Sequence, residues 1–225
     1  MNQGLQLSHI TKYYAEGSHR IAALEDVSIS VEPGEFVAVV GPSGSGKSTF
    51  LSIAGALLKA SEGEINLNGH NLSKLSDKEL SNVRLREIGF IMQSSNLVPY
   101  LNVLDQLLLV KKMSGKVTAE DKIFATNILE ELGLGSKLKS FPEELSGGEK
   151  QRTAIARSLI NDPNVILADE PTASLDTKRA HEVVGLIKQE VKSRRKAAIM
   201  VTHDERMLEY CDKVYRMEDG KMSLV

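Results

Sequence analysis

The amino-acid sequence predicts one α/β domain over residues 1–225, in which a parallel β-sheet is combined with a smaller antiparallel sheet and a helical insertion. Three observations predict this fold class. Strand–loop–helix units follow one another along the chain, alternating apolar and polar segments lie near both ends, and a long middle region carries helical patterns without a good strand. A chain of 225 residues fits one large α/β domain, or at most two small ones.

The strand–loop–helix units account for the parallel sheet. The first strand, Glu35–Val40, is dense in Val and Phe, and a glycine-rich loop leads from it into a helix that runs from Lys47 to about Leu58. The second strand, Val165–Asp169, is a continuous apolar run of the kind that is buried in parallel sheets. A helix over about Lys178–Ser193 follows, and the third strand is Ala197–Thr202. One face of that helix carries Ala180, Val183, Val184, Ile187 and Val191.

Segments near both ends have the pattern of an antiparallel sheet. Apolar and polar residues alternate there, or an apolar run meets a turn pair that is typical of hairpins. The segments are Leu5–Ile10, Val27–Val31, the run through Ile65 and Leu67 to Asn68–Gly69, and Val214–Met217 before Asp219–Gly220. We expect them to form a smaller antiparallel sheet beside the parallel one.

Residues of about 95–160 are predicted to form a helical subdomain. Leu129, Leu132 and Leu134 close one of its helices, and Gly133 and Gly135 break that helix.

Charge and cysteine content exclude some classes of function. The net charge of −2 provides no basic field for non-specific nucleic-acid binding, so we expect no nucleic-acid partner. The single cysteine, Cys211, cannot form an intramolecular disulfide, and one unpaired cysteine fits a reducing compartment. We interpret it as a small buried hydrophobic residue.

No segment has the pattern of a membrane helix or of a signal peptide. The most apolar stretch, Leu104–Val110, is interrupted by Asp105 and Gln106, and it is far shorter than the roughly 20 residues that a spanning helix needs. Met1–Gly4 lacks the basic and apolar pattern of a signal peptide. We therefore expect a soluble, cytoplasmic chain whose role at a membrane comes through a partner.

A phosphate-binding loop lies between the first strand and its helix. Residues Gly41, Pro42, Ser43, Gly44, Ser45, Gly46, Lys47, Ser48 and Thr49 match the pattern G-x-x-x-x-G-K-[ST]. The glycines let successive N–H groups turn inward as an anion nest, and the helix adds its positive end. Lys47 can reach the β- and γ-phosphates of a nucleotide, and the Ser48 hydroxyl can hold Mg²⁺. The alternative, a Gly/Ser-rich surface turn, is disfavoured by the flanking strand and helix.

Two carboxylates end the second strand. Asp169 is expected in the second shell of Mg²⁺, which it contacts through water, and Glu170 is expected to polarise the attacking water as general base. Alone, the pattern fits equally well a solvated acidic strand end before a turn at Pro171. Together with the phosphate loop it indicates nucleotide hydrolysis.

A second anion site is predicted at Leu145–Arg152. Ser146 and Glu149 have the S-x-x-E spacing of a capping box, which marks a helix start. Two consecutive glycines, Gly147 and Gly148, are poor for helix stability, but they let a phosphate approach the backbone closely.

Leu145–Glu149 resembles the signature sequence of ABC ATPases, and it lies about as far before the carboxylates as in that family. The resemblance covers the whole chain and implies a P-loop NTPase fold with a RecA-like core. It implies that Ser146, Gly147, Gly148 and Glu149 contact an ATP molecule bound by a partner chain. One small departure is the pair Glu149–Lys150, where many relatives have glutamines.

The remaining family motifs occur in order along the chain. Tyr14 resembles the residue that stacks on adenine, with Tyr13 as the competing choice. Gln93 resembles the glutamine that touches Mg²⁺ and senses the membrane partner. Ser174-Leu175-Asp176 resembles the D-loop, in which Asp176 crosses towards the partner chain. His203 resembles the switch histidine that contacts the γ-phosphate.

The resemblance also implies partners. One phosphate loop and one signature per chain mean that two chains are needed for two ATP sites, so we expect a head-to-tail homodimer that ATP closes and hydrolysis opens. We further expect two copies of an integral membrane permease, which place the dimer peripherally on the cytoplasmic side of the cell membrane. The segment Ser94–Leu101 is either a docking patch for that permease or a satellite of the core beneath a loop.

A finer resemblance is to the macrolide-exporter and lipoprotein-releasing subgroup. Ala23-Leu24, Gly34-Glu35-Phe36 and Gly89-Phe90 carry it. Within the subgroup, Ile91–Leu101 resembles the haem-exporter ATPases of Gram-positive bacteria, and Leu145–Arg152 with Leu167–Asp176 supports this. The resemblance implies an ATPase that powers haem efflux through its permease. Alternatives are export of antimicrobial peptides, drugs or lipoproteins, and a non-transport regulator of cell division.

Soluble ABC ATPases are the main rival class. Members that repair DNA or organise chromosomes have long coiled coils between phosphate loop and signature, whereas this chain has no sustained heptads there. Members that act in translation carry two ATPase domains in one chain, whereas this chain has one phosphate loop and one signature.

Overall fold

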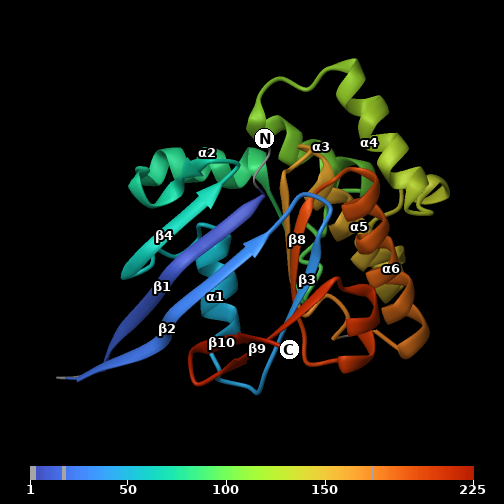
Figure 1. Ribbon diagram of the computed structural model, residues 1–225. Coiled ribbons are helices and arrows are strands. Elements are labelled where there is room, and N and C mark those ends of the chain that lie inside the picture. Colours follow the sequence, from blue (N-terminus) through green and yellow to red (C-terminus); the bar gives the residue numbers. More distant parts are fainter. Residues whose placement is uncertain (1–3, 17–18, 174) are drawn as a thin grey trace.

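The computed structural model describes residues 4–16, 19–173 and 175–225, which form stacked layers (Figure 1). A six-stranded sheet stands in the middle. Helix α1 (Lys47–Ala54) lies between this sheet and a smaller four-stranded sheet, and α3 (Val103–Ser114), α4 (Ala119–Glu131), α5 (Gly147–Leu159) and α6 (Thr177–Ser193) lie on the opposite side. The predicted fold class is thereby confirmed.

The six-stranded sheet has the order β10-β9-β3-β8-β7-β6. Its strands are β3 (Phe36–Val40), β6 (Ile88–Ile91), β7 (Val165–Asp169), β8 (Ala197–Val201), β9 (Lys213–Glu218) and β10 (Lys221–Leu224). All neighbours are parallel except β10 and β9. Alternate residues of its inner strands enter two different cores, because successive side chains point to opposite faces of a strand. Val165 and Leu167 face the smaller sheet, and Ile166 faces the helices.

The three predicted strands of this sheet are confirmed to within one residue. Strand β8 lies between β3 and the carboxylate strand β7. Strand β6, which pairs with β7, was not predicted as a strand. Its four residues include Gly89, whose backbone lies so close to Ser158 that a Cβ atom would come within 2.5 Å of the Ser158 carbonyl oxygen.

The smaller sheet has the order β2-β1-β4-β5. Its strands are β1 (Leu5–Glu16), β2 (His19–Val31), β4 (Glu62–Leu67) and β5 (His70–Asn71). Strands β1 and β2 are longer than predicted, because their antiparallel pairing continues past the alternating segments as far as Glu16 and His19. Asn68 and Gly69 both have positive φ, which confirms the predicted hairpin turn.

The last hairpin, β9–β10, forms as predicted around Asp219 and Gly220, whose φ values are 47° and 76°. Its assignment to the smaller sheet was wrong. Strand β9 pairs in parallel with β3, from Val37 opposite Lys213 to Val40 opposite Arg216, so the hairpin extends the edge of the larger sheet.

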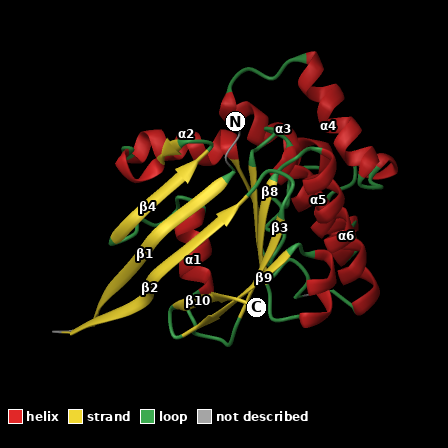
Figure 2. Ribbon diagram, in the orientation of Figure 1, coloured by secondary structure: helices red, strands yellow, loops and turns green. Residues whose placement is uncertain are grey.

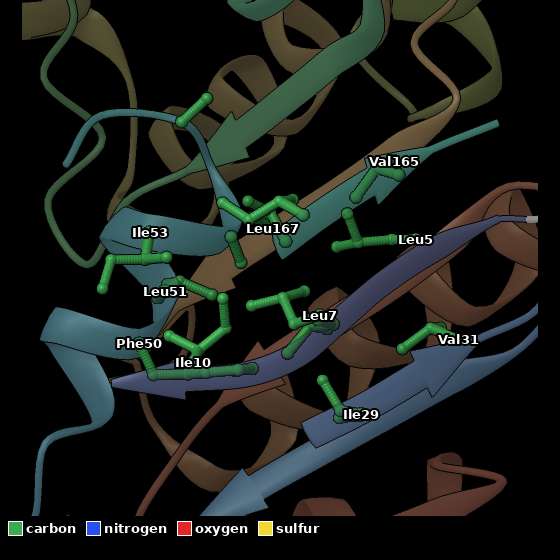
Figure 3. Close-up of a cluster of buried hydrophobic side chains, with 14 of the residues drawn as sticks. Leu5, Leu7, Ile10, Ile29, Val31, Phe50, Leu51, Ile53, Val165 and Leu167 are labelled. Carbon is green, nitrogen blue, oxygen red and sulfur yellow. The ribbon is translucent and has the colours of Figure 1, made fainter. Parts of the chain in front are cut away.

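Helix α1 fills the space between the two sheets. Phe50, Leu51 and Ile53 are buried there, and Figure 3 shows them with Leu7 of β1 and Leu167 of β7. The helix ends four residues earlier than predicted. The chain turns at Gly55 and at Ala56, which has a φ of 54°.

The remaining α-helices are coloured red, like α1, in Figure 2. They are α2 (Asp77–Glu87), α3 (Val103–Ser114), α4 (Ala119–Glu131), α5 (Gly147–Leu159) and α6 (Thr177–Ser193). Helix α2 was not predicted, because only Leu80 of its residues is buried and its apolar pattern is correspondingly weak. Residues 95–160 contain α3 to α5, two short 3₁₀ turns and no strand, as the pattern predicted. The predicted buried face of α6 is confirmed at all five positions.

No helix among the residues described combines the length and the apolar character needed to cross a lipid bilayer.

Candidate active site

A cleft of about 430 Å³ opens where β3, β7 and β8 end at the carboxyl edge of the larger sheet. Parallel strands collect their C-terminal loops at one edge, and ligands of open α/β sheets bind there. The lining residues are Ala23, Gly41, Ser43, Gly44, Gly46, Lys47, Ser48, Thr49, Gln93, Asp169, Glu170, Val201 and His203. Most of the residues predicted to bind the nucleotide phosphates and the metal thus meet in one cleft.

Glycine is required in the predicted phosphate loop for two separate reasons. Gly44 and Gly46 have φ values of 81° and 106°, which side chains rarely tolerate. At Gly46, which precedes α1, a Cβ atom would also lie 2.5 Å from the carbonyl oxygen of Ala23. No side chain caps the N-terminus of α1, so its first amides are left for a ligand. The loop thus has the form of an anion nest.

Lys47 bends back over this loop. Its Nζ atom donates to the carbonyl oxygens of Gly41 and Pro42, both at 2.7 Å. The ammonium group is therefore held at the mouth of the nest by two neutral acceptors. Phosphate oxygens are stronger acceptors, because hydrogen bonds between ionised groups are stronger than those to a neutral carbonyl.

Two predicted residues of the loop do not line the cleft. Pro42 is exposed beside it. Ser45 is buried, and its Oγ has no hydrogen-bond partner among the residues described. Its backbone carbonyl accepts the N–H of Gly220, so Ser45 fixes the loop to the β9–β10 turn.

Asp169 and Glu170 enter the cleft from the end of β7. Burial, and secondarily repulsion by Glu170, raise the pKa of Asp169, while the nearby charge of Lys47 acts in the opposite direction. Glu170 has a φ of 45° and donates its N–H to the carbonyl of Val201 at 2.9 Å. A left-handed non-glycine residue costs about 1–3 kcal/mol, and such residues cluster at functional sites.

His203 and Glu170 contact each other directly. The His203 Nδ1 atom lies 2.8 Å from Glu170 Oε2, and the imidazole is 70% exposed whereas the carboxylate is 16% exposed. The sequence suggested each residue separately and gave no sign of this contact. It is possible because Asp169 pairs with Val201 across β7 and β8, so that both strands end at the same level.

Three oxygen-bearing side chains of different origin line the same cleft. Ser48 comes from α1, Gln93 follows β6 by two residues, and Asp169 ends β7. Hydroxyl, amide and carboxylate oxygens are the ligands of hard cations such as Mg²⁺. The donor set therefore fits this metal.

The signature residues are built as a helix N-terminus. Ser146 caps α5, its Oγ accepting the N–H of Glu149 at 3.3 Å, and the Glu149 carboxylate accepts the N–H of Ser146 at 2.7 Å. This confirms the predicted capping box. The hydrogen bond from the Ser146 backbone also lowers the pKa of Glu149. Ser146 and Gly147 are exposed, whereas Gly148 is buried.

The signature does not line the cleft of its own chain. The residues around the cleft include none of Ser146–Glu149. Asp176, which caps α6 and accepts the N–H of Arg179 at 3.0 Å, is also not among them. Leu175 lies beside Gly147, so the signature and the D-loop are neighbours within one chain. Ser174, the first predicted D-loop residue, lies outside the described residues.

Strand pairing leaves the choice between Tyr13 and Tyr14 open. Tyr13 pairs with Ala22 and Tyr14 with Ile21, close in the chain to Ala23, which lines the cleft. The register shifts between Tyr13 and Lys12, which pairs with Leu24, so Ala23 is the extra residue of a β-bulge and strand alternation cannot be carried through it. Nothing in the sequence indicated that Ala23 lines the cleft, because its place there depends on the approach of its carbonyl to Gly46 of the phosphate loop.

The loop after Gln93 is partly exposed and partly packed. Tyr100 is 79% exposed, whereas Leu97 packs against the core formed by the helices. Leu97 thus belongs to a satellite of the core, whereas Tyr100 is exposed, as a docking patch would require.

Comparisons with known proteins agree with this arrangement. The family model described as ABC transporter matches residues 24–173. A protein named as a hemin import ATP-binding protein, HrtA, of Staphylococcus haemolyticus is 50% identical over 98% of this chain and 99% of its own length. A protein of the same name from Staphylococcus aureus is 46% identical over 97% of this chain and 99% of its own.

Solved structures of ABC transporter cassettes also match this chain. The dimeric structure of MJ0796, a bacterial ABC transporter cassette, matches with a TM-score of 0.87 and 37% identity over 97% of this chain and 96% of that one. A dimeric post-hydrolysis state of the same cassette, bound to ADP and Pi, matches with a TM-score of 0.86 and 37% identity over 98% of each chain.

Proposed function

The chain belongs to the ABC transporter family as an ATP-binding subunit with ATPase activity, and from this premise we propose that two copies of it sandwich two ATP molecules and thereby drive a membrane permease. Cassettes of this family dimerise and work with membrane components.

The observation that carries the proposal is the separation of the two anion sites within one chain. Lys47 and the phosphate loop line the cleft, whereas Ser146 and Gly147 are exposed and do not line it. Helix N-termini bind anions, and an exposed one with close-approach glycines is left without a ligand in its own chain. A second copy in head-to-tail orientation supplies that ligand, the γ-phosphate of its ATP. Asp176, beside the same surface, is proposed to cross towards the partner.

Each cleft residue then has a proposed role. Tyr14 stacks on adenine, and the loop amides, Lys47 and Thr49 hold the phosphates. Mg²⁺, when bound with ATP, neutralises phosphate charge, and Ser48, Gln93 and, through water, Asp169 would hold it.

Glu170 is proposed to accept the proton of the attacking water. His203, 2.8 Å from the Glu170 carboxylate, orients that carboxylate and contacts the γ-phosphate. Cleavage removes the charged bridge between the two chains, so the dimer opens.

The permease is proposed to contact the loop that contains Tyr100. A large aromatic side chain that is 79% exposed is a typical anchor of a protein interface. Through these contacts the chain is proposed to be held at the cytoplasmic face of the membrane, with two permease copies for two ATPase copies.

Haem is the proposed cargo of the permease. The resemblance in Ile91–Leu101 implies efflux, whereas the relatives of staphylococci are named for hemin import. Their names favour import as the second candidate direction. In either case the permease handles haem and this chain supplies the ATPase.

A transport assay tests the cargo and its direction. Cells with the wild-type chain and its permease are compared with cells that carry the Glu170→Gln chain after exposure to hemin. If the permease exports haem, cells with the variant should accumulate haem and lose hemin tolerance. ATP closes the variant dimer, but without hydrolysis the dimer does not reopen and the transport cycle stops. Import predicts less cell-associated haem in the variant. Unchanged haem content, with loss of resistance to a peptide or drug, would contradict both directions.

A further inference from the structure

The loop between β6 and α3, residues 92–101, is held by three side chains of the helical layer. Gln106 of α3 and Gln151 of α5 are 1% and 2% exposed, and Arg157 of α5 is partly buried. Each of them donates to backbone carbonyls of the loop. Buried polar side chains of this kind need their partners, because an unmet buried donor is costly.

Helix α5 holds the first half of the loop. Arg157 donates to the carbonyl of Ser95 at 2.7 Å and to that of Asn96 at 2.9 Å. Gln151 donates to the carbonyl of Met92 at 3.3 Å. Burial lowers the pKa of Arg157. Its hydrogen bonds are charge-assisted, and the one to Ser95 is part-buried, so they are stronger than bonds between neutral groups.

Helix α3 holds the second half. The Gln106 amide nitrogen donates to the carbonyls of Val98 and Leu101 at 2.7 and 2.9 Å, and its Oε1 atom accepts the N–H of Val98 at 3.0 Å. One side chain thus satisfies three backbone groups. The loop, despite its exposed Tyr100, is fixed to the helices at both ends.

Helix α5 therefore joins two functional surfaces. Its first turn carries Ser146 and Gly147, and its later turns hold Met92, Ser95 and Asn96. We propose that Arg157, supported by Gln106 and Gln151, is a positioning residue that makes the loop move as one body with α5. Phosphate binding at Ser146 then raises or lowers the affinity of the Tyr100 surface for its partner. A partner bound at Tyr100 changes the affinity of Ser146 for phosphate by the same factor, because coupling between two sites is reciprocal. The inference rests on the proposed function of both surfaces.

The first test uses the chain alone in the Glu170→Gln background. Hydrogen exchange of residues 92–101 is measured with and without Mg-ATP. We expect ATP to slow exchange roughly tenfold in the parent, as a strengthened charged hydrogen bond would. Arg157→Gln should lose this response while its ATP-dependent dimer, measured by size exclusion, persists. Arg157→Lys, which keeps the charge and a donor, should restore part of the response.

Lys111→Gln is the matched control. Lys111 of α3 donates to the carbonyl of Ile160, the residue that follows α5, and has no hydrogen bond to the loop, so its variant should respond like the parent. If Mg-ATP does not change the hydrogen exchange of residues 92–101 in the Glu170→Gln parent, the inference is overturned. An Arg157→Gln protein that responds as fully as the parent would also overturn it.

The second test adds the permease. Arg157→Gln should lower permease stimulation of ATP hydrolysis roughly tenfold and leave the unstimulated rate unchanged. Equal stimulation of both proteins would overturn the inference. Absence of stimulation in the wild-type chain would instead contradict the proposed function, and the exchange experiment would still decide the inference.

Discussion

Replacing Glu170 by Gln is expected to lower ATP turnover by a factor of about 10²–10⁴ without weakening ATP binding, because a positioned general base contributes that much to a rate. The amide keeps the size of the side chain and can still face His203, but it cannot accept the proton of water. ATP should then persist between two copies, and the variant should accumulate as a dimer. Turnover assays and size exclusion with Mg-ATP measure both effects.

Glu205→Gln is the control for this change. Glu205 is exposed, lies two residues after His203 and does not line the cleft, so its variant should hydrolyse ATP normally. A Glu170→Gln protein that stays monomeric with ATP and turns over at the wild-type rate would show that another group is the base.

Lys47→Ala is expected to weaken ATP binding by about a hundredfold. The substitution removes a cation that is already held at the mouth of the phosphate nest by the carbonyls of Gly41 and Pro42. Charged hydrogen bonds contribute about 1.5–3 kcal/mol each, and Lys47 can make more than one to the phosphates. Titration calorimetry with Mg-ATP measures the change.

Lys74→Ala serves as the comparison, because Lys74 is an exposed lysine that does not line the cleft. It should bind ATP like the wild-type chain. Unchanged affinity of Lys47→Ala in the same titration would contradict the assignment of the phosphate loop.

Local patterns in the sequence predicted the parts of the fold that depend on local physics. The continuous apolar run of β7, the apolar face of α6 and the Ser146–Glu149 capping box were all visible, because each depends on residues close together in the chain. The gathering of Lys47 and Asp169 in one cleft followed from the rule that parallel strands end at one edge.

Features that depend on distant pairing could not be predicted in the same way. The position of β8 between β3 and β7 and the pairing of β9 with β3 join segments far apart in sequence. The Glu170–His203 contact needs the register of β7 against β8. The three hydrogen bonds of Gln106 gave no signal either, because a buried glutamine looks like any other polar residue in a sequence.

In the proposed dimer, one ATP is bound by the phosphate loop of one copy and the signature of another. A variant with a damaged signature can be made without damaging the fold, because a Cβ atom on exposed Gly147 would meet only Leu175, at 3.9 Å. An aspartate there suits the first turn of a helix, yet its charge repels phosphate. Gly147→Asn controls for the added bulk.

The most direct test mixes Lys47→Ala and Gly147→Asp chains, each of which should be inactive alone. A mixed pair has one site in which both the phosphate loop and the signature are intact. The mixture should recover up to roughly a quarter of wild-type ATPase activity, since about half of randomly formed dimers are mixed and each has one intact site. A mixture as inactive as its separate components, or a Gly147→Asp chain with full activity, would contradict the claim.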